Sequence, residues 1–246
     1  MRVDILAESR DVSVAAAKAF FDAAASARRE GRSLAWVLSG GTTPLGAYAL
    51  IAEQAHTLDW PTIDVFFGDE RCVPPDHPDS NFGAVNKVLL ARIANRGARI
   101  HRIRGEINPV DAAAEYDRLL REFAESRRSP VFDLVFLGMG GDGHTASLFP
   151  DSIAILETEM WAIPAFSAAL DSWRVTMTPA ALSNARQVTF LVTGSGKADA
   201  LLHTLEGPHN ANRFPAQAIA PKSDAVRWIV DSDAAGKLRR SYSSAT

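Results

Sequence analysis

Three short, mostly apolar runs in the chain each end in a glycine-containing turn. The runs cover residues 34–38, 132–137 and 188–192, and a glycine follows each of them within two residues. Short apolar runs bounded by such turns are typical of strands that are buried on both faces. Strands of this kind, alternating with helices along the chain, restrict the fold to a mostly parallel sheet covered on both sides.

The rest of the sequence continues this alternation and predicts a doubly wound α/β fold. Residues 11–29 place apolar side chains at helical spacing, and Asn108-Pro109 and Thr178-Pro179 are typical helix starts. No repeat, low-complexity segment or change of composition marks a linker, so we expect one domain over residues 1–246. Further strands are predicted at 2–6, 63–67, 100–103, 173–177, 216–219 and 226–230, and further helices after Pro44, over 81–93 and up to about 205.

Bulk composition excludes several classes of protein. The 246 residues carry a formal net charge of −3, which does not indicate a strongly basic face for nucleic acid. A single cysteine, Cys72, rules out an intrachain disulfide and fits a reducing compartment. No run approaches the roughly 18 apolar residues of a membrane span, and the first residues do not resemble a signal peptide. We therefore expect a cytoplasmic monomer or weak dimer that binds neither nucleic acid nor membrane.

The turn after the 34–38 run predicts a phosphate site. Its residues are Ser39, Gly40, Gly41, Thr42 and Thr43, and Thr43 before Pro44 suits the N-cap of a helix. Free N–H groups and the helix dipole both attract an anion at such a junction, and the hydroxyl groups add donors. The alternative is a tight strand-to-helix turn that binds nothing. No Gly-Lys-Ser/Thr follows, so the loop is not a Walker A motif.

The turn after the 132–137 run predicts a catalytic pair. Asp142 and His144 stand two residues apart in it, as an orienting acid and a general base would. A His in this position is also often a structural residue. The glycines at 138, 140 and 143 match the dinucleotide fingerprint G-x-G-x-x-G, but the match lies past the middle of the chain and encloses Asp-Gly-His. A nicotinamide dehydrogenase is therefore the weaker interpretation.

Charged residues follow two other predicted strands. Asp69 and Arg71 come directly after residues 63–67, and Lys197 lies in the turn after 188–192. Ligands bind at the carboxyl ends of strands in open α/β sheets, so these side chains are site candidates as well as ordinary surface charges. Cys72 is interpreted as a bystander. The chain has neither His-Glu-x-x-His nor G-x-S-x-G, and we expect no metal and no cofactor.

Several motifs, in this order, resemble the 6-phosphogluconolactonases, which are related to the glucosamine-6-phosphate deaminases/isomerases. The resemblance covers nearly the whole chain. Its motifs are Ser-Gly-Gly-Thr-Thr-Pro at 39–44, Asp-Glu-Arg-Cys-Val-Pro at 69–74 with Ser80-Asn81, the segment 138–150, Arg-Val-Thr-Met-Thr-Pro at 174–179, Gly-Ser-Gly-Lys-Ala at 194–198 and Pro-Ala-Gln-Ala at 215–218.

This resemblance implies roles for individual residues. The substrate would be a sugar phosphate, with its phosphate on the 39–43 loop and with positive charge from Arg174 and Lys197. His144 would be the general base with Asp142 beside it, and Arg71 would reach the substrate.

The resemblance also separates the two branches of the family. Deaminases carry an acidic residue shortly after Asp-Gly-His, in a segment ending Asn-Glu-Pro, whereas residues 145–150 here contain no acid. Lactone hydrolysis by water that His144 activates is thus the expected activity. The alternatives are a deaminase/isomerase and a non-catalytic sugar-phosphate sensor, and the presence of both Asp142 and His144 argues against the sensor.

Overall fold

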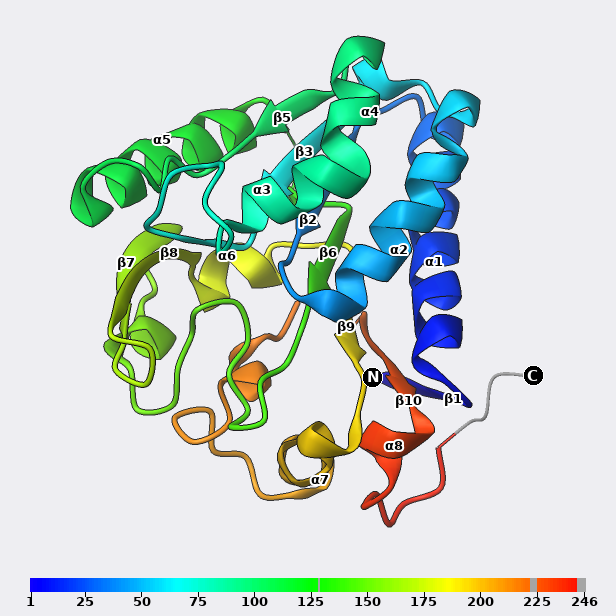
Figure 1. The fold of residues 1–246 in the computed structure, drawn as a ribbon, viewed down its shortest axis with the longest axis vertical. Helices are drawn as coiled ribbons and strands as arrows, with labels where there is room; N and C mark the ends of the chain where they lie inside the picture. The colour runs from blue at the N-terminus through cyan, green and yellow to red at the C-terminus, as the bar shows by residue number, and fades with distance from the viewer. Residues whose placement is uncertain (128, 222–224, 243–246) are drawn as a thin grey trace.

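Seven parallel strands form the central sheet of the protein (Figure 1). The computed structural model describes residues 1–127, 129–221 and 225–242. In spatial order the strands are β1 (Arg2–Leu6), β10 (Val226–Asp231), β9 (Val188–Val192), β6 (Leu134–Leu137), β2 (Leu34–Leu38), β3 (Ile63–Phe67) and β5 (Arg99–His101). Every neighbouring pair is parallel, which confirms the predicted mostly parallel sheet.

Helices cover both faces of this sheet, as a doubly wound fold requires (Figure 1). One face carries α1 (Ser9–Arg29), α2 (Thr42–Glu53) and a helical stretch made of α3 (Asn81–Val85), the π-helical turn η3 (Asn86–Leu90) and α4 (Ala91–Ile93). The other face carries α5 (Pro109–Glu125) and α6 (Pro179–Ser183). The remaining helices are α7 (Ala198–Glu206), α8 (Ser232–Ala235) and the short 3₁₀ turns η1 (Ala55–Thr57), η2 (Trp60–Thr62), η4 (Ala94–Arg96), η5 (Ile153–Leu156), η6 (Ser195–Lys197) and η7 (Pro215–Ala218).

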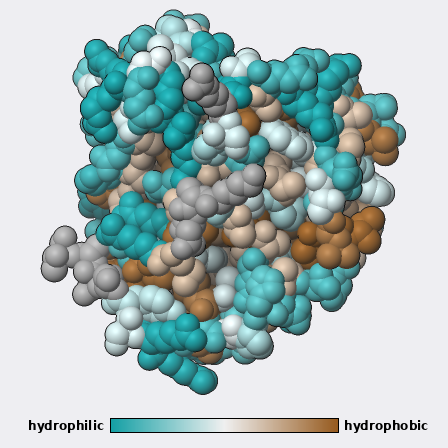
Figure 2. Space-filling view, turned by 180° about the vertical axis from the view of Figure 1, so that it is seen from behind, coloured by the Kyte–Doolittle hydropathy of each residue, from teal (hydrophilic) through white to brown (hydrophobic). Residues whose placement is uncertain are grey.

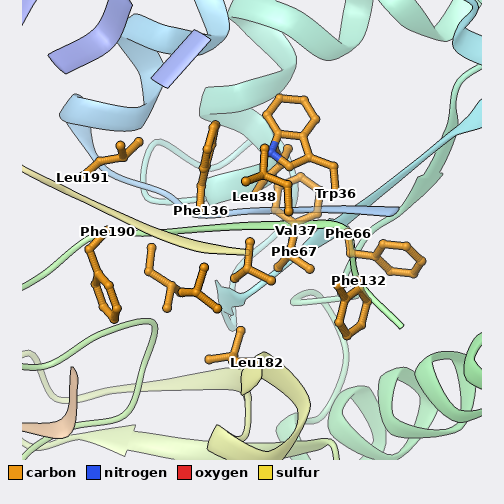
Figure 3. Packing of buried hydrophobic residues seen from close by; sticks show 14 of the residues in the cluster. Trp36, Val37, Leu38, Phe66, Phe67, Phe132, Phe136, Leu182, Phe190 and Leu191 are labelled. Carbon is orange, nitrogen blue, oxygen red and sulfur yellow. The ribbon is translucent and has the colours of Figure 1, made fainter. Parts of the chain in front are cut away.

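Large side chains fill the space on both sides of the sheet. Neighbouring residues of a strand point to opposite faces of the sheet. Trp36, Leu38 and Phe136 pack on the face covered by α1 and α2, whereas Phe132 and Phe190 fill the opposite face (Figure 3). The rings of Trp36 and Phe136 meet edge to face at 5.7 Å. Burying each such side chain stabilises the fold by roughly 1.5–3 kcal/mol.

A second, antiparallel sheet lies beside the first and was not predicted. Its order is β4 (Asp69–Arg71), β8 (Ser172–Met177) and β7 (Ala162–Ser167). The strand predicted at 173–177 is confirmed, and it is the middle strand of this small sheet. Since β4 starts two residues after β3 ends, the small sheet begins at the carboxyl end of the large one.

Two details of the sequence analysis are wrong. Residues 216–219 do not form a strand, because Pro215 opens the 3₁₀ turn η7 and the Gln217 side chain bonds to the backbone of α7. Thr43 is not an N-cap: helix α2 begins at Thr42, two residues earlier than predicted, with Gly41 as its N-cap, and Thr43 Oγ1 instead lies 2.7 Å from Thr193 Oγ1. The other predicted strands and helices are confirmed, with ends shifted by a few residues.

The sheet has a switch point between β2 and β6. From β2 the chain continues through α2 to β3 on one side, and from β6 it next enters the large sheet at β9 on the other side. The loops after β2 and β6 therefore run in opposite directions from the carboxyl ends of these two strands. A crevice at this place is the usual ligand site of open α/β sheets.

Exposed apolar side chains gather in one segment of the chain. Of the nine large hydrophobic side chains that are exposed in the described residues, six belong to residues 153–173. Figure 2 shows hydrophobic residues gathered at one edge of the molecule on an otherwise mixed surface. Within the described ranges, no helix combines the length and the apolar character that crossing a membrane requires.

Candidate active site

A cleft of about 220 Å³ lies at the switch point and is lined by most of the predicted site residues. Ten of the eleven predicted site residues line the cleft: Ser39, Gly40, Gly41, Thr42, Thr43, Asp69, Arg71, His144, Arg174 and Lys197. The eleventh, Asp142, does not line the cleft and instead contacts His144. The residues come from five separate parts of the sequence, so the fold alone brings them together.

The 39–43 loop lines the cleft and includes the start of helix α2. Gly41 has a φ of 98°, a conformation that L side chains rarely adopt, and this lets the chain turn from β2 directly into the helix. The first turn of α2 contains no acidic residue. Its unpaired N–H groups and the positive end of its dipole therefore remain available to an anion.

His144 lines the cleft and forms a hydrogen-bonded pair with Asp142. Nδ1 of His144 lies 2.6 Å from Oδ1 of Asp142, and the same oxygen accepts a bond from the His144 backbone N–H. Burial raises the pKa of Asp142, but the charge of His144 and these hydrogen bonds outweigh it and lower that pKa below its usual value. An ionised carboxylate only accepts, so Nδ1 must donate, and a neutral ring then keeps its lone pair on Nε2.

Residues 138–144, called the catalytic turn below, hold this pair in place. Gly140 N–H donates to the His144 carbonyl at 2.8 Å, and Thr145 Oγ1 donates to the Gly138 carbonyl at 2.8 Å. A Cβ at Gly140 would lie 2.2 Å from His144 Nδ1 and 2.5 Å from Asp142 Oδ1, so the pair rests directly on this glycine. No helix follows the turn, which removes the context that a dinucleotide fingerprint needs.

Two arginines lie side by side in the cleft. Arg71 of β4 and Arg174 of β8 are register partners in the small sheet. The Nε atoms of both are buried without a hydrogen-bond partner among the described residues. Burial, followed by the neighbouring charge of Arg71, lowers the pKa of Arg174. Two adjacent guanidinium groups with free donors are an arrangement that an anionic ligand would stabilise.

Asp69 is held in the cleft wall by two neutral donors. Ser147 Oγ donates to its Oδ2 at 2.6 Å and Asn81 Nδ2 to its Oδ1 at 3.2 Å. The Asn81 side chain also lies against Gly40, where an added Cβ would meet its Oδ1 at 1.9 Å. Asn81 thus connects Asp69 with the 39–43 loop, and helix α3 is the element that carries it.

Asn81, Ala146 and Thr193 also line the cleft and were not among the predicted site residues. Thr193 follows the predicted strand at 188–192 directly, so its place at the carboxyl end of a strand was a usable signal. Ala146 has a φ of 48°, which is uncommon for a residue other than glycine. Asn81 stands in a family motif, but nothing local in the sequence places a helix start beside the 39–43 loop.

The cleft gives no sign of metal or thiol chemistry. In residues 1–127, 129–221 and 225–242, no three His, Cys, Asp or Glu side chains are grouped so that they could hold a metal ion. Burial, together with the charge of Glu70, raises the pKa of Cys72 to about 11. Its thiol is therefore protonated at neutral pH, in agreement with the bystander interpretation.

Comparison with known proteins points to one family. The sequence profile of the glucosamine-6-phosphate isomerases/6-phosphogluconolactonase matches residues 7–228. The chain is 36% identical to a 6-phosphogluconolactonase of Aggregatibacter actinomycetemcomitans over 82% of its length and 86% of the relative's. It is 34% identical to the human 6-phosphogluconolactonase, with 96% and 93% of the two chains covered.

A solved structure agrees with these sequences. The 6-phosphogluconolactonase from Trypanosoma brucei superimposes with a TM-score of 0.84 at 26% identity and covers 97% of this chain and 98% of its own. The profile match over residues 7–228 includes every segment that lines the cleft. The chain therefore belongs to the glucosamine-6-phosphate isomerase/6-phosphogluconolactonase family.

Proposed function

We propose that this protein hydrolyses 6-phospho-D-glucono-1,5-lactone to 6-phospho-D-gluconate, the reaction after which its relatives are named. The observation that carries the proposal is that one cleft is lined by both His144, which Asp142 contacts, and the 39–43 loop. A phosphorylated lactone needs both: a base that activates water and a separate site for its phosphate.

In the proposed reaction, Nε2 of His144 takes a proton from water as the water oxygen bonds to the lactone carbonyl carbon. The bond from that carbon to the ring oxygen then breaks, and His144 returns the proton to the ring oxygen. Asp142 keeps the ring in the required tautomer through its 2.6 Å contact with Nδ1. Arg71 or N–H groups of the catalytic turn would stabilise the tetrahedral oxyanion, and one such donor contributes roughly 2.7–4 kcal/mol.

The phosphate would bind on the 39–43 loop. The N–H and hydroxyl groups of the 39–43 loop supply neutral donors, and Arg174 and Lys197 supply charge. A carboxyl oxygen of Asp69, which already accepts from Ser147, would also accept from a sugar hydroxyl. No metal or other cofactor enters the scheme, because a lactone is reactive enough for general base catalysis.

The isomerase/deaminase reaction is not favoured. Residues 145–150 contain no acid that could assist ring opening, and the ring of Phe149 lies 5.1 Å from the ring of His144. The space beside the base is therefore occupied by an apolar group. Ammonia release from glucosamine 6-phosphate would contradict this interpretation.

The proposed function is tested by acid release from freshly prepared 6-phosphogluconolactone. We expect the protein to accelerate acid release well above the spontaneous rate, and to act much more weakly on unphosphorylated gluconolactone because the phosphate site then stays empty. Equal rates with both lactones would contradict the phosphate site, and no acceleration with either would contradict the enzyme assignment.

Replacing Arg174 or Lys197 with Met should weaken binding more than turnover. Each substitution removes a charged hydrogen bond of roughly 1.5–3 kcal/mol, so KM for the phosphorylated lactone should rise about 10- to 100-fold. Steady-state kinetics and titration with inorganic phosphate measure the effect. Arg92→Met and Lys87→Met, at exposed helical positions, are the matched controls. An unchanged KM would remove the residue in question from the phosphate site.

A further inference from the structure

Two buried tyrosine hydroxyl groups hold the ends of the strands from which the cleft loops depart. Tyr48 of α2 accepts a hydrogen bond from Ser39 N–H at 3.0 Å and donates to the Ser39 carbonyl at 2.9 Å. Tyr116 of α5 does the same at Phe67, with both distances 2.9 Å. Each hydroxyl thus satisfies both backbone groups of one residue.

At each of these two residues a neighbouring strand has ended on one side; Phe67 keeps its register partner Leu38 in β2 but has none in β5. The pairing of β2 with β6 ends at Val37, and the pairing of β3 with β5 ends at Phe66. Ser39 and Phe67 lie just beyond these points, as the strands separate. A buried amide and carbonyl left unpaired there would favour a change of backbone conformation.

Ser39 and Phe67, the residues that the two hydroxyl groups bind, each lead into a different part of the site. Ser39 is the first residue of the 39–43 loop, whereas Phe67 is followed by Gly68 and then by Asp69 and Arg71. The hydroxyl of Tyr48 therefore fixes the origin of the phosphate loop, and the hydroxyl of Tyr116 fixes the origin of the strand that carries Arg71.

Both rings are anchored strongly enough to act in this way. Tyr48 is fully buried and Tyr116 is 2% exposed, and the ring of Tyr48 packs edge to face on Trp36 at 5.5 Å. Burial raises the pKa of both hydroxyl groups, so each keeps the proton that it donates. The rest of each side chain belongs to the core, and only its oxygen contacts a strand end.

We propose that Tyr48 and Tyr116 are positioning residues for the reaction, Tyr48 acting through the phosphate loop and Tyr116 through Asp69 and Arg71. The inference rests on the proposed lactonase function for its kinetic readout. That the two hydroxyl groups hold Ser39 and Phe67, here called the tyrosine clamps, rests on the fold alone.

The test replaces each tyrosine by Phe, which keeps the ring and removes one oxygen. Tyr48→Phe should raise KM for the phosphorylated lactone and the Kd of inorganic phosphate by about tenfold, with kcat changed less than about twofold. Tyr116→Phe should instead lower kcat by about tenfold and leave the Kd of inorganic phosphate unchanged. Tyr242→Phe is the control, because its hydroxyl bonds to Glu206 and neither residue lines the cleft.

Two results would overturn the proposal even if the wild-type protein hydrolyses the lactone. One is that KM, kcat and the Kd of inorganic phosphate are unchanged in both variants. The other is that both variants change KM and kcat in the same proportion. Amide hydrogen exchange of the wild-type protein adds a measurement that needs no variant. The Ser39 and Phe67 amides should exchange as slowly as those inside β2 and β3, and rapid exchange would exclude the clamps whether or not the protein is a lactonase.

Discussion

Replacing His144 with Gln should lower kcat by about 10²–10⁴-fold and change KM little, because the substitution removes a general base and keeps a polar side chain of similar size. In the proposed binding mode the phosphate contacts the 39–43 loop, Arg174 and Lys197 and does not involve this side chain. Steady-state kinetics with the phosphorylated lactone measure both constants. His56→Gln, in the exposed turn η1, is the control for losing an imidazole elsewhere.

The pH dependence of kcat tests the role of His144 in a second way. Protonation of Nε2 removes the lone pair that accepts the proton from water, so kcat should fall when the solution is made acidic. Asp142 does not cause a fall near neutral pH, since its lowered pKa keeps it ionised there. Any stability that its charge contributes is present at neutral pH and is lost only as the pH falls through that lowered pKa.

These measurements separate a base from a bystander. Near-normal turnover in His144→Gln would exclude the ring as the base, and a flat profile down to about pH 5 would contradict the proposed water activation. A parallel loss in His56→Gln would indicate a general effect on folding, which thermal unfolding of the three proteins would reveal.

The parts of this site that follow from local chemistry were predictable from the sequence. The glycine-containing turns and the Asp142–His144 spacing are short-range features, and each of them fixes a backbone turn or a side-chain pair within a few residues. The parallel sheet could be predicted for the same reason, since strand, turn and helix signals are local. The carboxyl-end rule then placed the 39–43 loop, Asp69 and Lys197 in one region.

Long-range pairings could not be predicted in this way. The small antiparallel sheet joins β4 to β8, a hundred residues apart along the chain, and it alone sets Arg174 beside Arg71. Arg174 was named only through the family resemblance. The contact of Asn81 with Gly40 and the two tyrosine clamps likewise depend on tertiary packing that leaves no periodic signal in the sequence.

Gly140→Ala should lower kcat by about 10²-fold although the methyl group contacts no substrate. The added Cβ would lie 2.2 and 2.3 Å from Nδ1 and Cε1 of His144 and 2.5 Å from Oδ1 of Asp142, so the pair has to move. The φ of Gly140 is not in the left-handed region, so alanine adopts this backbone without strain. A displacement of a catalytic group by about 1 Å typically costs on the order of 10²-fold in rate.

The control and a double variant make this result specific. Gly196→Ala adds the same methyl group in open space near the cleft and should leave kcat unchanged. If Gly140 acts only through His144, then Gly140→Ala combined with His144→Gln should be no slower than His144→Gln alone, because a misplaced base and a missing base fail at the same step. If the two losses multiply in the double variant, Gly140 serves the reaction in some way that does not pass through His144.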